Sequence, residues 1–244
     1  AFMTERLNGE DGLGAIYPAM ANSVMAMDAL GYGPEHPDRA TAMAGIRKLL
    51  TDDAAGRRFV QPCVSPVWDT TLAMHALAEA DGDVDADAAR WLRERQVLDH
   101  RGDWAVQRPD VRPGGWPFEY ANPDYPDIDD TAAIGMALDR SGDPANHEAV
   151  ERAAEWILGL QSADGGWGAF DADNTRRYLN HIPFADHGAL LDPPTADVTG
   201  RCLGFLAQLG YGTDHAAVAR GLAYLRREQE ADGSWFGRDR KSVV

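Results

Sequence analysis

The sequence is poor in cysteine, in positive charge and in long apolar runs. Its 244 residues hold two cysteines, Cys63 and Cys202, which fits a reducing compartment and argues against a disulfide framework. Basic residues number 23 against 39 acidic ones, and the resulting net charge of −16 argues against binding nucleic acid or an anionic lipid surface by charge. The longest apolar run, residues 132–138, is too short to span a bilayer.

The sequence does contain an internal repeat. Residues 91–104, 156–167 and 224–235 each run from an aromatic residue through a Gln and a Gly-containing turn to a Trp. The three glutamines stand 65 and 68 residues apart. A second element, rich in small and apolar residues, recurs in phase at residues 68–77, 129–138 and 197–206.

The two repeated elements predict a pair of helices. The second element begins with Asp and Thr, which are good N-cap residues, and is apolar on nearly every side, as a buried inner helix would be. The first element carries charges on one face, which is typical of an outer helix. Patterns typical of strands are nearly absent. We therefore predict an all-α fold, an α/α toroid in which the inner helices share one end, with the Gln and Trp holding neighbouring turns.

The stretch YPDIDDTAAIG, residues 125–135, places three carboxylates where an inner helix should begin. One interpretation is structural: Asp129 or Asp130 caps the helix and Asp127 is solvated. The other is a strong acid, because neighbouring carboxylates favour keeping one proton and a bonded cation stabilises the carboxylate as that proton leaves. Capping and catalysis are compatible, so these residues alone leave both open.

Taken together, the repeats and the aspartate stretch resemble the squalene–hopene cyclase family of class II triterpene cyclases. The supporting segments are QPCVSPVWDT, GDWAVQRPDVRPGGWPFEYANPDYPDIDDTA, GGWGAFDADNT and NHIPFADHG. Family members are much longer, so the resemblance implies an internal fragment: residues 1–63 would end one α-barrel domain, and residues 64–244 would begin the catalytic α-barrel domain. The isolated fragment is expected to be inactive.

For function, the resemblance implies cofactor-free, proton-initiated polycyclisation of squalene, or of a similar linear isoprenoid, to hopene- or hopanol-type triterpenes. Asp129 would be the proton donor, Asp127 and Asp130 its neighbours, and Arg201 the supporting cation. A class II cyclase of another isoprenoid stays open as an alternative. So does an incomplete toroid that only binds lipid or a partner.

The same resemblance implies a pocket that binds the substrate. Aromatic faces stabilise a moving carbocation without reacting with it. The implied pocket residues are Trp68, Phe118 and Phe170, with the acidic pair Asp69 and Asp197 in support and Phe184 at the entrance. Core packing is the alternative for each aromatic, and N-capping is the alternative for the acidic pair.

No metal or cofactor is expected, because the seven histidines show no ligand spacing and two segments resembling calcium loops lack the required glycine. The partners implied by the resemblance are a hydrophobic isoprenoid, the membrane surface and a second copy of the chain in a homodimer. The expected location is the cytoplasmic side of the cell membrane, where the protein would be held by an apolar patch and not by charge.

Overall fold

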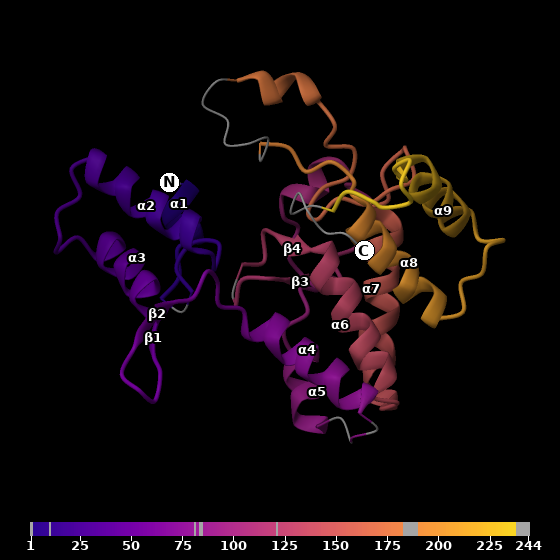
Figure 1. Cartoon of the computed structure of the whole chain (residues 1–244), viewed down its shortest axis with the longest axis horizontal. Helices are drawn as coiled ribbons and strands as arrows, with labels where there is room; N and C mark the ends of the chain where they lie inside the picture. The colour runs from indigo at the N-terminus through magenta and orange to yellow at the C-terminus, as the bar shows by residue number, and fades with distance from the viewer. Residues whose placement is uncertain are drawn as a thin grey trace. The chain divides into compact units, whose positions relative to one another are not determined.

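The computed structural model describes residues 2–9, 11–80, 82, 85–120, 122–182 and 190–237 (Figure 1). Contacts within the chain divide it into two units. The N-terminal unit is Ala1–Thr70 with Pro117–Asn122, and the C-terminal unit is Thr71–Trp116 with Pro123–Val244. A domain boundary near Cys63 stays a prediction.

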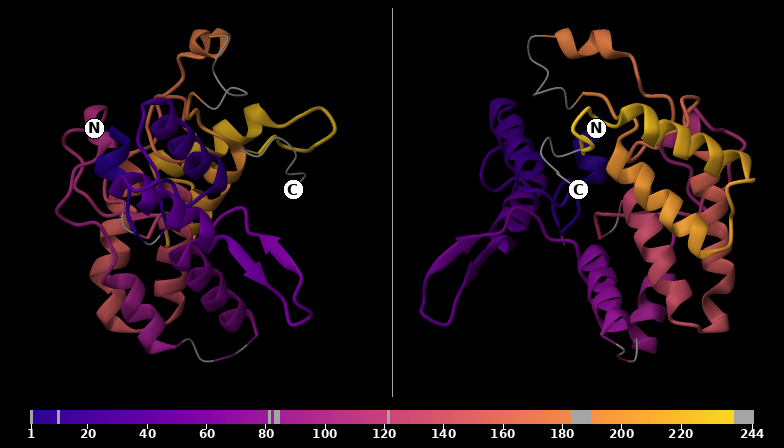
Figure 2. Two further views of the ribbon diagram at one scale, coloured as in Figure 1. Left: turned by 90° about the vertical axis from the view of Figure 1, so that its left-hand side faces the viewer. Right: turned by 45° about the vertical axis from the view of Figure 1, so that its right-hand side comes forward.

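The N-terminal unit is built on two packed helices, α2 and α3. Val24 and Met27 of α2 meet Ala42 of α3 in a small apolar core. A hairpin follows, with Leu50 paired to Val60, and Figure 2 shows it extending away from the two helices. This hairpin is a strand pair that the sequence pattern did not predict, because its residues are exposed and do not alternate in polarity. The elements are α1 (Phe2–Arg6), α2 (Tyr17–Ala29), α3 (Pro37–Lys48), β1 (Leu50–Asp52), β2 (Arg58–Val60) and the start of α4 (Pro66–Glu79).

The C-terminal unit consists of inner and outer helices. Helix α6 packs against both α7 and α8, and α8 packs against α9. Helix α6 is buried over most of its length, as expected of an inner helix, whereas α7 and α9 carry exposed charges. The elements are α5 (Ala86–Arg93), η1 (Asp103–Val106), β3 (Trp116–Pro117), β4 (Pro126–Asp127), α6 (Ile128–Arg140), η2 (Pro144–Asn146), α7 (His147–Gly159), η3 (Arg177–His181), α8 (Ala196–Gln208) and α9 (Ala216–Glu228). The predicted all-α class and its alternation of inner and outer helices are confirmed.

The inner helices α6 and α8 are parallel and share one end. Near their starts Arg201 bonds Asp129, and near their ends Gln208 bonds the carbonyl of Met136. Both pairs are separated by 72 residues, so the two helices run in the same direction and in constant register. The N-termini of the inner helices therefore meet at one end, as the repeat predicts.

The glutamines of the first two repeats each join two turns of backbone. Gln96 donates to the carbonyls of Gly114 and Ala149 at 2.8 and 2.9 Å, and Gln161 donates to those of Gly165 and Ala217 at 2.8 Å each. The second carbonyl of each pair belongs to the first turn of the following outer helix. Gln96 and Gln161 thus each fasten one repeat to the next, as the sequence interpretation expects, whereas Gln229 of the third repeat donates to the carbonyl of Gly233 at 2.9 Å.

The tryptophan of the first repeat is Trp116, and the prediction of Trp104 is wrong. Trp116 donates from Nε1 to the carbonyl of Leu92 at 2.7 Å, just as Trp167 donates to that of Ile157. Trp104 instead packs edge-on against Trp156 at a ring distance of 5.9 Å. The segment between Gln96 and its glycine turn is longer in this repeat. The sequence pattern therefore matched Trp104, and not Trp116, with Trp167 of the second repeat.

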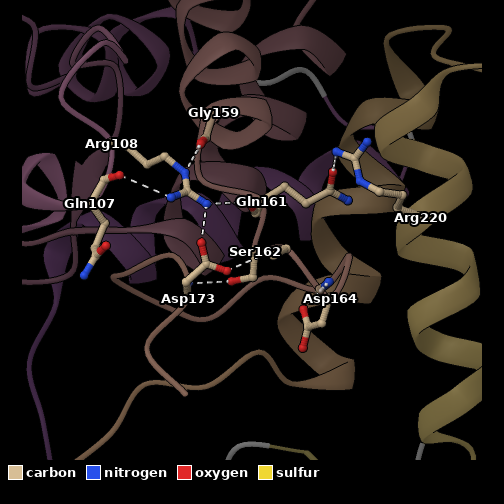
Figure 3. A network of polar contacts seen from close by, with 10 residues as sticks. Gln107, Arg108, Gly159, Gln161, Ser162, Asp164, Asp173 and Arg220 are labelled. Carbon is tan, nitrogen blue, oxygen red and sulfur yellow. Dashed lines mark hydrogen bonds and ion pairs between the residues drawn. The ribbon is translucent and has the colours of Figure 1, made fainter. Parts of the chain in front are cut away.

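A polar network fixes the loop that follows the second repeat glutamine (Figure 3). Arg108 donates to the carbonyls of Gly159 and Gln161 at 3.1 Å each and to Asp173 at 2.7 Å. The side-chain oxygen of Gln161 accepts from Arg220 of α9. Asp173 stands at a φ of 58°, a left-handed conformation that Asp tolerates better than most residues. The loop that carries Phe170 is therefore anchored to the outer helices.

Candidate active site

The aspartate stretch forms the N-terminus of α6, and Asp127 is its cap. The Oδ1 atom of Asp127 accepts from the backbone N–H of Asp129 at 2.7 Å and from that of Asp130 at 3.3 Å. Thr131 donates its hydroxyl to the Asp127 carbonyl at 2.6 Å and accepts from the backbone N–H of Trp116 at 2.9 Å. The expectation that Asp129 or Asp130 caps the helix while Asp127 is solvated is wrong, since Asp127 is only 9% exposed.

Asp129 meets Arg201 of the neighbouring inner helix. The Nε atom of Arg201 donates to Oδ1 of Asp129 at 2.6 Å, a short charge-assisted bond. The Asp129 side chain is 28% exposed and that of Arg201 is 37% exposed. Asp129 is therefore held in place by a cation and is still accessible from outside.

Asp130 is the buried member of the cluster. It is 3% exposed, and among the described residues its Oδ1 atom has no hydrogen-bond partner. Burial raises the pKa of Asp130 well above its ordinary value, the charges of Asp127 and Asp129 raise it further, and Arg201 opposes the shift. Three carboxylates beside one guanidinium thus favour keeping a proton on Asp130.

An apolar hollow of about 540 Å³ opens beside this cluster. Arg201 and Asp197 contribute its polar edge, and its other walls are Met136, Ala196, Gly200, Gly204, Leu225, Trp235, Phe236 and Gly237. Asp197 lies in the first turn of α8, but the N-cap of that helix is Thr195, so capping does not explain Asp197. A second hollow of about 600 Å³ lies near Asp139, at the opposite end of α6 from Asp127, Asp129 and Asp130.

Phe170 lies on the loop between the second repeat tryptophan and α8. Its ring stands edge-on to that of Tyr125 at 6.3 Å, two residues before the cap Asp127. The Ala169 carbonyl accepts from the backbone N–H of Ile128 at 2.7 Å. Asp129 and Arg201 are thus in contact beside Asp127 and Asp130, and the loop that carries Phe170 is bonded to the first residue of α6.

Trp68, Asp69 and Phe118 belong to the N-terminal unit. Trp68 and Asp69 lie in the first turn of α4, where Ser65 caps the helix by accepting from the Trp68 N–H at 3.0 Å. The Ser65 hydroxyl also donates to the carbonyl of Phe118 at 2.7 Å. Ser65 therefore positions both aromatics, and the capping alternative for Asp69 does not hold. Phe184 lies outside the described residues.

Sequence reasoning missed two positioning groups, Ser65 and Asp192. Ser65 has a recognisable signal, because a Ser followed by Pro marks the start of a helix. Asp192 stands before two prolines, which indicates only an extended segment. Its function as a backbone acceptor, described below, depends on how the loop of residues 168–171 folds over it, which no local pattern indicates.

Two other kinds of site are absent from the described residues. No group of three or more His, Cys, Asp or Glu side chains in this part of the chain is arranged to hold a metal ion. No helix in the described ranges combines the length and apolarity that crossing a membrane requires.

Comparisons with known proteins identify the family of this chain. A family model described as the squalene-hopene cyclase C-terminal domain matches residues 64–242, and one described as the squalene-hopene cyclase N-terminal domain matches residues 1–55. A squalene–hopene cyclase from Zymomonas mobilis is 54% identical over 97% of the chain. Those from Bradyrhizobium diazoefficiens and Alicyclobacillus acidocaldarius are 57% and 40% identical over 98% and 97% of the chain. The chain spans 38%, 37% and 38% of these relatives' lengths. With one model matching most of its length, the chain belongs to the squalene–hopene cyclase family.

Proposed function

We propose that this chain supplies the acid of a squalene–hopene-type cyclase, which protonates squalene or a similar linear isoprenoid and starts its polycyclisation. The observation that carries the proposal is the contact of Arg201 with Asp129 beside the buried Asp130, next to an apolar hollow. A hydrocarbon substrate needs such a hollow, and an unactivated alkene needs a strong acid held against it.

The three carboxylates of the cluster have three different tasks. Asp130, buried and raised in pKa, keeps a proton on the cluster. Asp129 is the member whose side chain is accessible enough to meet a substrate, so it is the proton donor. Asp127 holds both residues at the helix end through their backbone N–H groups. The positive end of the α6 dipole also favours the carboxylate that forms when the proton leaves.

In the first step the proton held by the cluster passes to Asp129, and the π electrons of a terminal double bond take it from the Asp129 carboxyl group. The O–H bond breaks, a C–H bond forms, and a tertiary carbocation appears on the substrate. The Arg201 guanidinium stabilises the new Asp129 carboxylate, and further double bonds attack the cation in turn. Loss of a proton at the end gives a hopene-type product, and capture of water gives a hopanol-type product. Arg201 does not return the lost proton, because its guanidinium stays charged, so water must reload the cluster.

We propose that Trp68, Phe118 and Phe170 face the cation, that Asp69 and Asp197 support the acid cluster, and that Phe184 lines the entrance. What supports the aromatic assignment is the fixed backbone of each described member: Ser65 holds Trp68 and Phe118, and the loop bonds hold Phe170. Removing the Phe118 ring by Phe118→Ala should release products with fewer rings, since a cation formed midway loses its stabilising face.

The proposal extends to organisation and location. Residues 1–63 would end one α-barrel domain and residues 64–244 would begin the catalytic one, which is supported by the family models that match on either side of this boundary. The substrate is dissolved in membrane hydrocarbon, so the whole protein would bind the cytoplasmic face of the membrane through an apolar patch, as a homodimer.

The test uses a chimera in which residues 2–237 replace the matching segment of the Zymomonas mobilis relative. The chimera should convert squalene into pentacyclic products detectable by gas chromatography with mass spectrometry. Turnover of another linear isoprenoid but not of squalene would favour the alternative class II cyclase. A folded chimera that cyclises neither substrate would contradict the proposal and favour a toroid that only binds lipid or a partner.

A further inference from the structure

Asp192 lies outside the aspartate cluster and accepts three consecutive backbone N–H groups. Its Oδ1 atom accepts from Ala169 at 3.1 Å, and its Oδ2 atom accepts from Phe170 at 2.6 Å and from Asp171 at 2.9 Å. Asp192 is 9% exposed, so these bonds are shielded from water. A buried carboxylate that accepts three N–H groups holds the backbone more firmly than neutral side chains do.

The segment held by Asp192 is also fixed at its start and passes close to Asp192. The Trp167 backbone N–H donates to the Thr199 hydroxyl at 3.0 Å, and the Trp167 carbonyl accepts from the Thr195 N–H at 3.1 Å. A Cβ atom at Gly168 would lie 2.7 Å from the Asp192 carbonyl oxygen and 3.0 Å from its Oδ2 atom. Glycine is therefore required at position 168 for the segment to approach the carboxylate.

The same segment is bonded directly to the acid cluster. The carbonyl of Ala169, whose N–H is held by Asp192, accepts from the Ile128 N–H at 2.7 Å. Ile128 lies between the cap Asp127 and the proposed donor Asp129. The next residue of the segment, Phe170, is the proposed pocket aromatic. The peptide unit between Ala169 and Phe170 thus connects the Asp192 carboxylate both to the acid cluster, through the Ile128 N–H, and to the Phe170 ring.

We propose that Asp192 is a positioning residue for the cyclisation: it fixes the Ala169–Asp171 backbone, and through this backbone it sets both the Ile128 N–H bond that orients the acid cluster and the direction of the Phe170 ring. This inference rests on the proposed function. Asp192 has no contact with substrate in this role, so its loss should slow the reaction and alter ring closure without abolishing protonation. Misplacement of a reacting group by about 1 Å costs up to about 10²-fold in rate.

Two substitutions grade the effect in the chimera. Asp192→Ala removes both acceptor oxygens and all three hydrogen bonds. Asp192→Asn can keep its oxygen on Phe170 and Asp171 but turns an NH₂ group toward the N–H of Ala169, which breaks one of the three bonds. We expect kcat to fall about 10-fold for Asn and about 10²-fold for Ala, with KM nearly unchanged and more partially cyclised products.

The matched control is Gln96→Ala, which removes two bonds to backbone carbonyls elsewhere in the same unit. It should lower the melting temperature and leave the product ratio unchanged, because the product ratio does not depend on how much protein is folded. If Asp192→Asn leaves kcat and the product ratio unchanged, or if Gln96→Ala shifts the ratio equally, the positioning role is overturned.

Hydrogen exchange distinguishes failure of this inference from failure of the proposed function. Asp192→Asn should speed amide exchange at Ala169 and Ile128, which needs no catalytic activity to observe. An inactive chimera in which these amides still respond would contradict the proposed function alone. An active chimera in which Ile128 exchange is unchanged by Asp192→Asn would refute the link through Ala169.

Discussion

The guanidinium of Arg201 donates a 2.6 Å hydrogen bond to the carboxylate of Asp129 across 72 residues of sequence. This bond joins the N-terminal turn of α6 to α8, and both helices belong to the inner layer of the repeat. Because the partners are partly exposed, their pairing contributes little to stability by itself. In the proposed function its significance is chemical, since a carboxyl group that loses a proton to a hydrocarbon needs a fixed cation beside the charge that develops.

The first prediction concerns Asp129 as the proton donor. Asp129→Asn in the chimera keeps the shape of the side chain and its hydrogen bonding but removes the acidic proton. Asp127 makes the cap, so the helix should survive, and circular dichroism should be unchanged. Squalene turnover should fall by more than the roughly 10²–10⁴-fold typical of ordinary acid–base assistance. Turnover near the unsubstituted level by a folded Asp129→Asn chimera would remove Asp129 from the mechanism.

The second prediction concerns Arg201 and the direction in which kcat changes with pH when its charge can titrate. Arg201→Gln should lower kcat by about 10²-fold, less than Asp129→Asn, because it removes one stabilising donor and not the proton source. At low pH, Arg201→His should retain more activity than Arg201→Gln, because the histidine is charged there. This advantage should be lost as pH rises through the histidine pKa, which is ordinarily about 6.5 and is raised here by the carboxylates. The measurement is kcat against pH for the three proteins. A flat difference between the histidine and arginine proteins would contradict a charge-based role.

How far the sequence predicts this structure depends on the kind of contact. Helix pairs follow from periodicity and local capping, so the inner and outer helices were predictable. The contact of Arg201 with Asp129 was implied only by resemblance, since no local pattern specifies a bond between residues so far apart. Trp116 was missed because Trp104 also follows Gln96, and only the fold shows which indole reaches Leu92.

The third prediction concerns the packing of the inner helices. A Cβ atom at Gly135 of α6 would lie 2.5 Å from the ring of Phe205 on α8, so Gly135→Ala should force the helices apart and destabilise the protein by about 1–3 kcal/mol. A Cβ atom at Gly204 of α8 would meet no atom of the described residues within 4 Å beyond its own helix backbone. Gly204→Ala is therefore the matched control and should be stabilising by up to about 1 kcal/mol. Thermal melting of the two variants measures both effects, and equal melting temperatures would contradict the close approach.

The fourth prediction concerns the repeat glutamine Gln161. It is 6% exposed and donates to the carbonyls of Gly165 and Ala217, and Gln161→Ala removes both of these buried hydrogen bonds. The loss should be about 2–4 kcal/mol and should appear as a clear fall in melting temperature. Gln107 provides the control, since it lies in the same network with an exposed side chain (Figure 3), and Gln107→Ala should change stability by less than about 0.5 kcal/mol. A fall as large for Gln107→Ala would show that the repeat glutamine has no special role.

The fifth prediction concerns Glu119 in the N-terminal unit. Burial raises the pKa of Glu119 from 4.5 to about 7, with Asp11 adding to the shift and a hydrogen bond from Asn122 opposing it. Its Oε2 atom is buried, and among the described residues it has no hydrogen-bond partner. The folded state therefore favours the protonated acid, so this group stabilises the fold fully below its unfolded pKa, and that contribution is lost as pH rises toward 7.

Glu119→Gln replaces the acid with a neutral group of the same shape, so the variant should not lose this contribution as pH rises. Near pH 4 the variant and the unsubstituted chimera should melt at similar temperatures. The variant should then become relatively more stable up to about pH 7, by at most about 3 kcal/mol, with no further change above that pH. The control is Glu35→Gln, which changes an exposed glutamate of the same unit. If the Glu119→Gln difference is flat from pH 4 to 8, Glu119 is not a buried acid that carries its proton near neutrality.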